Sequence, residues 1–146
     1  MKKLFYLLAC ALMVVAIPAC SPDGDDDNLP SEGKLIGSWK QTHAKFTEKV
    51  DGNVVNSGSI NVPAEAAWFW TFNEDGSFVM TIEGDSEHGT WSIEQNKLTM
   101  NYNEGGDDVC TIKSLSKSKL VINAVSNDGS SANALVYLEY TFVKQK

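Results

Sequence analysis

Hydrophobic and polar residues alternate along most of the chain after residue 34, which is the period of a β-strand with one buried face. One clear run places Trp68, Trp70 and Phe72 on one face of a strand and leaves Phe69 on the other. The segment 63–67 can form a single helical turn between strands. The alternation predicts strands near 35–48, 53–62, 67–73, 77–83, 88–94, 97–103, 108–115, 119–125 and 135–144.

Residues that tolerate tight or left-handed turns separate the predicted strands. They are Asp51-Gly52, Glu74-Asp75-Gly76, Glu83-Gly84-Asp85, Gln95-Asn96, Gly105-Gly106, Ser116-Lys117-Ser118 and Asp128-Gly129. Consecutive strands joined by such hairpins favour an all-β fold, an antiparallel up-and-down barrel of eight or nine strands. A two-sheet sandwich built from the same strands is the alternative, because the alternation alone does not separate the two.

The first twenty residues have the organisation of a secretory signal: a basic start, an apolar run over 4–17 and a small residue before a cysteine. The apolar run is shorter than the ~20 residues of a membrane-spanning helix, so a retained span is the weaker interpretation. Ile17, Ala19 and Cys20 resemble the lipobox of bacterial lipoproteins. The resemblance implies a signal peptide at 1–19 and a lipidated N-terminal Cys20, through which the protein is anchored to a membrane.

An ordinary signal cleavage near Ala19, with Cys20 left as a free thiol, is the alternative. Residues 20–33 are acidic and contain nothing that builds a core, so we expect a flexible linker. Acidic residues just after the cysteine resemble the surface-export signal of lipoproteins in some Gram-negative bacteria. That resemblance implies the outer membrane and the cell surface, with the periplasmic face as the alternative. Residues 34–146 then form one folded domain.

Charge and cysteine content narrow the chemistry of the domain. Loss of Lys2 and Lys3 leaves ten lysines, no arginine and nineteen acidic residues. Nucleic acid is excluded as a partner, because its phosphates need a basic surface. Once Cys10 and Cys20 are assigned to the signal and the lipid, Cys110 has no partner for a disulfide. No basic residue near Cys110 favours its thiolate, so we interpret it as a buried apolar residue rather than a nucleophile.

Two Gly-x-Trp motifs carry a second resemblance. Gly37-Ser38-Trp39 opens the first predicted strand, an Asp75-Gly76 turn follows an aromatic strand, and Gly89-Thr90-Trp91 begins the next motif. Their order and spacing resemble the lipocalin-like domains of small bacterial lipoproteins over nearly the whole mature domain, which implies a β-barrel.

The two motifs also predict where their tryptophans pack. Gly37 and Gly89 allow Trp39 and Trp91 to pack against close backbone, so we expect these four residues to be a fold signature with both indoles in the core. Many lipocalins place an arginine over the first tryptophan. This chain has none, and Lys144 is the candidate for that cationic position.

Catalysis has little support in the sequence. His43 and His88 are separated by several predicted strands and neither has a motif partner for zinc or for a nucleophile. The sequence therefore predicts no enzyme, with no catalytic residue, metal site or cofactor.

Two functional hypotheses remain. In the first, the barrel interior holds a small apolar molecule. In the second, side chains fill the barrel, and its surface binds another envelope protein or a glycan. The volume left open inside the barrel distinguishes the two hypotheses, because only the first requires a cavity. The candidate ligand-lining residues of the first hypothesis are Trp70, Phe72, Met80, Ile82, Trp91, Met100, Tyr102, Ile122, Leu138 and Tyr140.

Overall fold

Nine strands follow the alternating pattern in the computed structural model, which describes residues 30–126 and 133–146. The predicted signal peptide, Cys20, the first part of the linker and the Asp128-Gly129 turn lie outside the described residues. The elements are α1 (Glu32–Leu35), β1 (Gly37–Val50), β2 (Asn53–Asn61), η1 (Ala64–Ala66), β3 (Phe69–Phe72), β4 (Ser77–Ile82), β5 (Asp85–Glu94), β6 (Lys97–Tyr102), β7 (Asp107–Leu115), β8 (Lys119–Ser126) and β9 (Ala134–Lys144).

The strands close into a barrel because the last strand pairs with the first. Hydrogen-bonded neighbours follow the order β2-β1-β3-β4-β5-β6-β7-β8-β9, and β9 returns to β1 from Trp39 opposite Lys144 to Val50 opposite Ala134. The barrel predicted from the alternation is therefore confirmed, and the sandwich alternative is wrong. Closure covers most of the strand edges that an open sheet of this size would expose.

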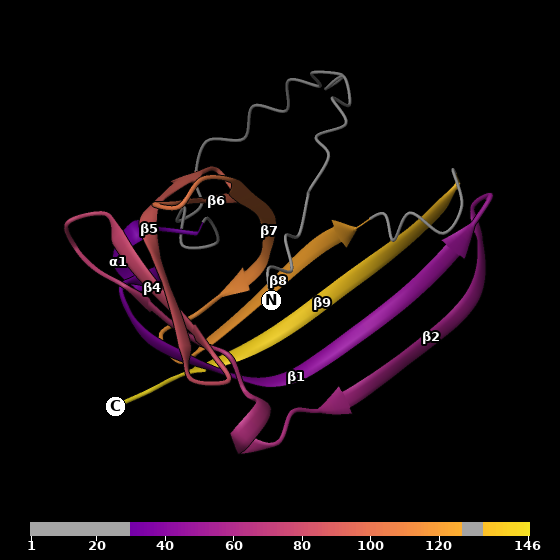
Figure 1. Cartoon of the computed structure of the whole chain (residues 1–146), viewed down its shortest axis with the longest axis horizontal. Coiled ribbons are helices and arrows are strands. Elements are labelled where there is room, and N and C mark those ends of the chain that lie inside the picture. The colour runs from indigo at the N-terminus through magenta and orange to yellow at the C-terminus, as the bar shows by residue number, and fades with distance from the viewer. Residues whose placement is uncertain (1–29, 127–132) are drawn as a thin grey trace, which may run out of the picture.

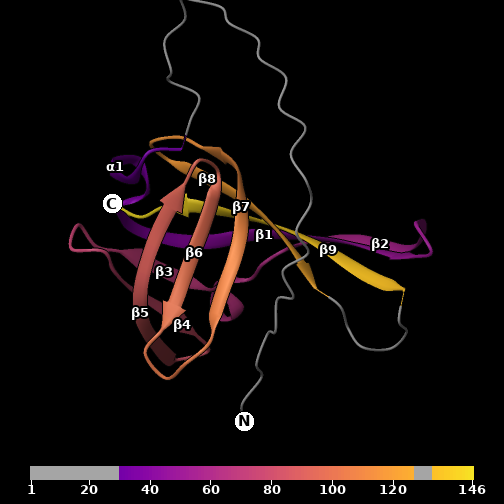
Figure 2. The ribbon, with the colours of Figure 1, turned by 90° about the horizontal axis from the view of Figure 1, so that it is seen from above.

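One strand departs from a simple meander. β3 pairs with Gly37–Lys40 at the start of β1, while β2 pairs with His43–Val50 farther along the same edge. Eight strands therefore form the ring and β2 is an addition to it. Beyond the ring, β1, β2, β8 and β9 continue as a long ribbon (Figure 1 and Figure 2).

Hairpin turns lie where the turn residues predict them. The β1–β2 turn has positive φ at both central residues, 50° at Asp51 and 79° at Gly52. The β4–β5 turn repeats this pattern, with 52° at Glu83 and 92° at Gly84. Consecutive left-handed residues match the right-handed twist of the flanking strands, which fixes the register of each hairpin.

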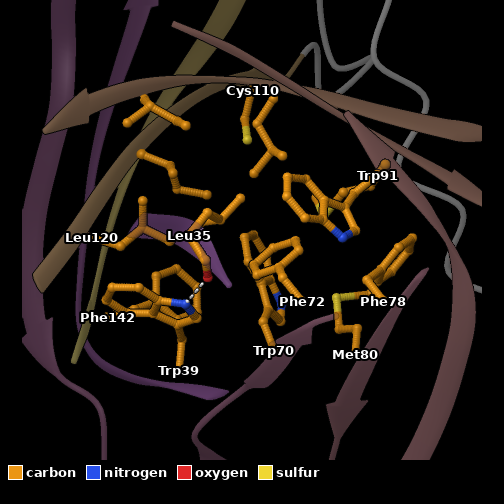
Figure 3. Packing of buried hydrophobic residues seen from close by; sticks show 14 residues of the cluster. Leu35, Trp39, Trp70, Phe72, Phe78, Met80, Trp91, Cys110, Leu120 and Phe142 are labelled. Carbon is orange, nitrogen blue, oxygen red and sulfur yellow. Dashed lines mark hydrogen bonds between the residues drawn. The ribbon is translucent and has the colours of Figure 1, made fainter. Parts of the chain in front are cut away.

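The short helix α1 closes one end of the barrel, and the sequence pattern did not predict it. The first strand was expected to begin at residue 35, but Leu35 instead ends α1 and is completely buried in the barrel end. The linker boundary expected at residue 33 accordingly falls inside this helix. The indole Nε1 of Trp39 donates a hydrogen bond of 2.7 Å to the Leu35 carbonyl oxygen (Figure 3).

Lys144 completes this closed end. Its Nζ lies 5.1 Å from the centroid of the Trp39 ring and donates to the Lys34 carbonyl oxygen at 3.3 Å. The cationic position that the sequence analysis assigned to Lys144 is thus confirmed. The contact of the Lys144 ammonium with the Trp39 ring and its hydrogen bond to the Lys34 carbonyl oxygen both hold α1 against the barrel.

Aromatic side chains fill the half of the barrel next to α1 (Figure 3). The Trp70 ring lies 4.5 Å from Phe142 and 5.9 Å from Phe72, measured between centroids. Trp39 and Trp91 are both buried, as their Gly-x-Trp motifs predict, whereas Phe69 lies on the outer face. The contacts are those of a solid core, so this half has no room for a ligand.

The described elements and the whole buried cluster lie between Glu32 and Lys144. The barrel is therefore complete without the first 29 residues, and a segment beginning at residue 21 retains every part of it. Neither α1 nor η1, the two helices of the described residues, has the length and apolar character needed to cross a membrane.

Candidate ligand cavity

A cavity occupies the half of the barrel opposite α1. The centre of a water molecule can occupy about 80 Å³ of this cavity. The whole empty space, including the solvent at its mouth, measures about 620 Å³. The structure brings seven of the ten predicted lining residues together around this cavity. They are Trp70, Met80, Ile82, Met100, Ile122, Leu138 and Tyr140.

The period of the strands explains why these residues meet. Met80 and Ile82 are two apart on β4, and Leu138 and Tyr140 are two apart on β9, so each pair faces the same side. The β4 pair lies toward the end of that strand remote from α1, and the β9 pair lies in the middle of its strand. Trp68, just before β3, also lines the cavity and packs on Tyr140 with ring centroids 5.1 Å apart.

The other three predicted lining residues do not line the cavity, although the Tyr102 hydroxyl contacts Asp108 and Met80, which do. Phe72 and Trp91 pack edge to face at 5.5 Å in the filled half of the barrel. Tyr102 packs edge to face on Phe78 at 5.3 Å. All three face inward as the alternation requires, but the alternation does not indicate which end of the barrel is filled.

The cavity reaches the wall where the pairing of β7 with β8 stops. The ladder runs from Leu115 opposite Leu120 to Thr111 opposite Asn123. In the described part of the chain, β7 before Thr111 pairs only with β6, and β8 after Asn123 pairs only with β9. The two strands diverge from there (Figure 1). Residues on both sides of this divergence line the cavity: Asp108, Cys110, Ala124, Val125 and Ser126.

Asp108 is the one residue with an acidic or basic side chain among the described residues that line the cavity. The hydroxyl of Tyr102 donates a hydrogen bond of 2.7 Å to Asp108 Oδ2. Burial raises the pKa of the Asp108 carboxyl, the charge of Asp107 raises it further, and the bond from Tyr102 opposes both. Burial also raises the pKa of the Tyr102 phenol, so its hydroxyl stays a donor at neutral pH.

Cys110 faces the cavity from β7 and is buried. Burial raises the pKa of its thiol to about 12, and the neighbouring Asp108 adds to the shift. The thiol is therefore protonated at neutral pH, which agrees with its interpretation as a buried apolar residue and gives it no activation as a nucleophile.

Comparison with known families agrees with this architecture. Residues 35–122 match the family described as "Lipocalin-like domain". The chain belongs to the lipocalin-like domain family. The match spans both Gly-x-Trp motifs and most of the barrel strands, so the resemblance of this domain to lipocalin-like domains is confirmed. This lipocalin-like fold is typically one of binding proteins rather than enzymes.

Several solved structures are similar to this lipocalin-like barrel at low sequence identity. A lipocalin-like protein from Bacteroides uniformis is 17% identical, with a TM-score of 0.48 over 77% of this chain and 100% of its own. A bovine lipocalin allergen is 16% identical, with a TM-score of 0.44 over 77% of this chain and 74% of its own. Bovine odorant binding protein in complex with a selenium-containing odorant is 16% identical, with a TM-score of 0.43, and the match covers 88% of this chain and 78% of that one. No curated protein matches the chain.

Sequence reasoning missed Asp108 and the mouth of the lipocalin-like cavity. The alternation predicts which face of β7 a residue occupies but not where its pairing with β8 ends. The available signal was Asp108 on the same face of its strand as Cys110 and Ile112, since acidic residues are rarely buried unless they are paired.

We expect the stability of the lipocalin-like barrel to depend on pH through the titration of Asp108. Because burial raises the pKa of this carboxyl, the folded state binds its proton more tightly than the unfolded state does. The contribution of Asp108 is thus fully favourable below the pKa of the unfolded carboxyl, about 3.9, and is lost as the pH rises through the higher pKa of the folded state.

Asp108→Asn removes that titration. The free energy of unfolding of the wild type, relative to this variant, is expected to fall in urea titrations as the pH is raised from about 3, below the pKa of the unfolded carboxyl. Asp85→Asn, an exposed change at the start of β5, serves as the control. A wild-type difference from Asp108→Asn that stays constant across this range would contradict the burial of the carboxylate.

Proposed function

We propose that the chain is a lipid-anchored envelope lipoprotein whose lipocalin-like barrel binds a small hydrophobic ligand in the cavity opposite α1. The cavity carries the proposal. Its wall is almost entirely apolar, it reaches the surface at the β7–β8 divergence, and it lies in a fold used mainly for binding. An apolar hollow with few polar groups is the usual form of a small-molecule site.

The size of the cavity restricts the ligand to a compact molecule. A single water needs roughly 10–15 Å³ by the same measure, so about 80 Å³ holds a short alkyl chain or one ring. The remaining length of the ligand lies in the mouth between β7 and β8. A larger rigid molecule would have to displace Trp68 or Tyr140, whose rings pack on each other.

The anchor and the cavity lie at opposite ends in this proposal. The chain enters the barrel through α1, which closes the end remote from the cavity. A lipid on Cys20 and a flexible linker over 20–33 would therefore tether the closed end of the barrel to the outer membrane, at the cell surface or on its periplasmic face. Incorporation of labelled palmitate, and its loss in Cys20→Ser, tests the anchor.

The alternative function is an interaction module that binds an envelope protein or a glycan. Exposed apolar side chains along β2 favour it, with Val54 and Ile60 each 59% exposed. Phe69 is 39% exposed on the barrel wall, but Lys40 Nζ lies 5.6 Å from its ring centroid, so the ring is a poor open platform for a sugar.

Blocking the cavity tests the proposed function. We expect native mass spectrometry of residues 21–146, after incubation with a bacterial envelope lipid extract, to show a retained small adduct. Ala124→Phe places a ring in the mouth and should lower the fraction of protein carrying the adduct at least tenfold. Thr111→Phe adds the same ring at an exposed position of β7 and should leave the adduct unchanged.

Cooperative thermal unfolding of both variants checks that each remains folded. A bare mass for the wild type, or an adduct that survives in Ala124→Phe, would contradict binding in the cavity. In that case the exposed side chains of β2 would become the first surface to test for a protein partner.

A further inference from the structure

The apolar wall of the cavity continues onto the inner face of the ribbon formed by β8, β9, β1 and β2 (Figure 1 and Figure 2). Side chains directly opposite each other in an antiparallel ladder point to the same face of the sheet. The strand pairings therefore extend two rows of residues from the cavity across the ribbon. One row is Ile122, Tyr140, Ala44 and Ile60, and the other is Ala124, Leu138, Phe46 and Gly58.

These eight residues form an uncharged surface, which we call the apolar track. The first two residues of each row line the cavity, and the track continues from them over β1 and β2. The Tyr140 hydroxyl is the one polar side-chain group in the two rows. The Phe46 ring lies over Gly58, where a Cβ would be 2.7 Å from its Cε1. The track ends at Ile60, whose side chain is 59% exposed.

The track has the dimensions of one alkyl chain. Three strand spacings of about 4.8 Å separate β8 from β2, so the track is roughly 14 Å long. Its two rows are two residues apart along each strand, which makes it roughly 7 Å wide. An extended chain advances about 1.2 Å per bond, so roughly a dozen carbons cover this length. The next row toward the ribbon tip is mostly polar and limits the track there: Ser126, Val136, Glu48 and Asn56.

We infer that the ligand carries a linear alkyl chain, and that the length of this chain left outside the cavity lies on the apolar track. The inference rests on the proposed function, because one end of the chain must fill the cavity. The cavity takes only a short alkyl segment, and the track begins at Ala124 in its mouth. A chain on the track covers Phe46 and Ile60, which removes apolar surface from water on both partners. The polar end of the ligand then reaches water at the outer edge of β2.

Three unbranched carboxylates measure the length of the binding site: octanoate, dodecanoate and hexadecanoate. They share the same charged end and differ only in apolar length. A methylene group buried on one side should raise the affinity roughly twofold. We therefore expect isothermal titration calorimetry with residues 21–146 to show dodecanoate binding at least about tenfold, and hexadecanoate at least about a hundredfold, more tightly than octanoate.

Two equally exposed residues of β2 assign the length dependence to the track. Ile60 and Val54 are each 59% exposed, but Ile60 shares the inner face with Ala44, and Val54 shares the outer face with Lys49. Ile60→Ser should lower the hexadecanoate affinity at least about fivefold and leave the octanoate affinity unchanged. Val54→Ser should leave both affinities unchanged. An unchanged octanoate affinity also shows that the barrel of each variant is folded.

The outcomes separate the track from the cavity. Hexadecanoate binding no more tightly than octanoate overturns the inference and leaves the proposed function standing, since octanoate still occupies the cavity. A hexadecanoate affinity that does not fall in Ile60→Ser, or that falls equally in Val54→Ser, also overturns the inference. Failure of all three probes to bind contradicts the proposed function and the inference together.

Discussion

Gly89→Ala is expected to destabilise the barrel by more than about 4 kcal/mol, enough to leave most of the chain unfolded at 37 °C. Gly89 is buried in β5, where a Cβ would collide with the backbone oxygen of Asn101 and lie 2.7 Å from Cε1 of Phe78. The backbone oxygen cannot withdraw without opening the β5–β6 ladder around the pair Gly89–Tyr102. The effect therefore comes from backbone contact rather than from a flexible side chain.

Gly33→Ala is the matched control for this change. Gly33 lies in α1 with open space around the position of a Cβ, and alanine favours the helix. Urea unfolding should show stability unchanged or slightly raised for Gly33→Ala and a collapsed transition for Gly89→Ala. A Gly89→Ala protein that unfolds within about 1 kcal/mol of the wild type would contradict the close packing of β5 on β6.

Trp39→Ala is expected to cost about 3–5 kcal/mol, the range for a large buried aromatic side chain. Trp39 is completely buried and donates to the Leu35 carbonyl oxygen. Its loss leaves a cavity at the closed end, removes the ring under the Lys144 ammonium and loosens α1. We expect amide hydrogen exchange to accelerate in α1 and at the end of β9, in addition to the lower midpoint of urea unfolding.

Trp68→Ala provides the comparison, because Trp68 is only half-buried and lies beside the cavity. Its substitution should cost clearly less than that of Trp39 and should leave exchange at the closed end unchanged. Equal losses for the two variants would contradict the division of the barrel into a packed half and a hollow half.

Local sequence signals predicted which face each strand buries. Trp70 and Phe72 point inward and Phe69 outward because side chains on a strand alternate, and burial of two large rings determines the register. Asp51-Gly52 predicted its hairpin for an equally local reason, since both residues adopt a left-handed backbone.

Those local signals did not predict which strands pair with each other over long sequence distances. The return of β3 to the start of β1 leaves β2 on the far half of the same edge, and no residue pattern in either strand specifies that choice. The packed half has the same alternation as the hollow half, so Phe72 and Trp91 were indistinguishable by sequence from Met80 and Met100 as lining residues. Volume depends on which rings meet across the barrel, and that requires the three-dimensional structure.

The central claim is that the ligand occupies the cavity between Met80 and Met100. These two residues are the only methionines between residues 21 and 146, and both line the cavity. Methyl NMR of that segment, labelled with ¹³C at the methionine methyl groups, therefore gives two signals that both report from the site.

Titration with the ligand recovered from the envelope extract should shift both methyl signals along one saturating curve. Ala124→Phe should abolish the shifts. Two signals that stay in place while mass spectrometry or calorimetry shows the ligand bound would place the ligand outside the cavity and contradict the account.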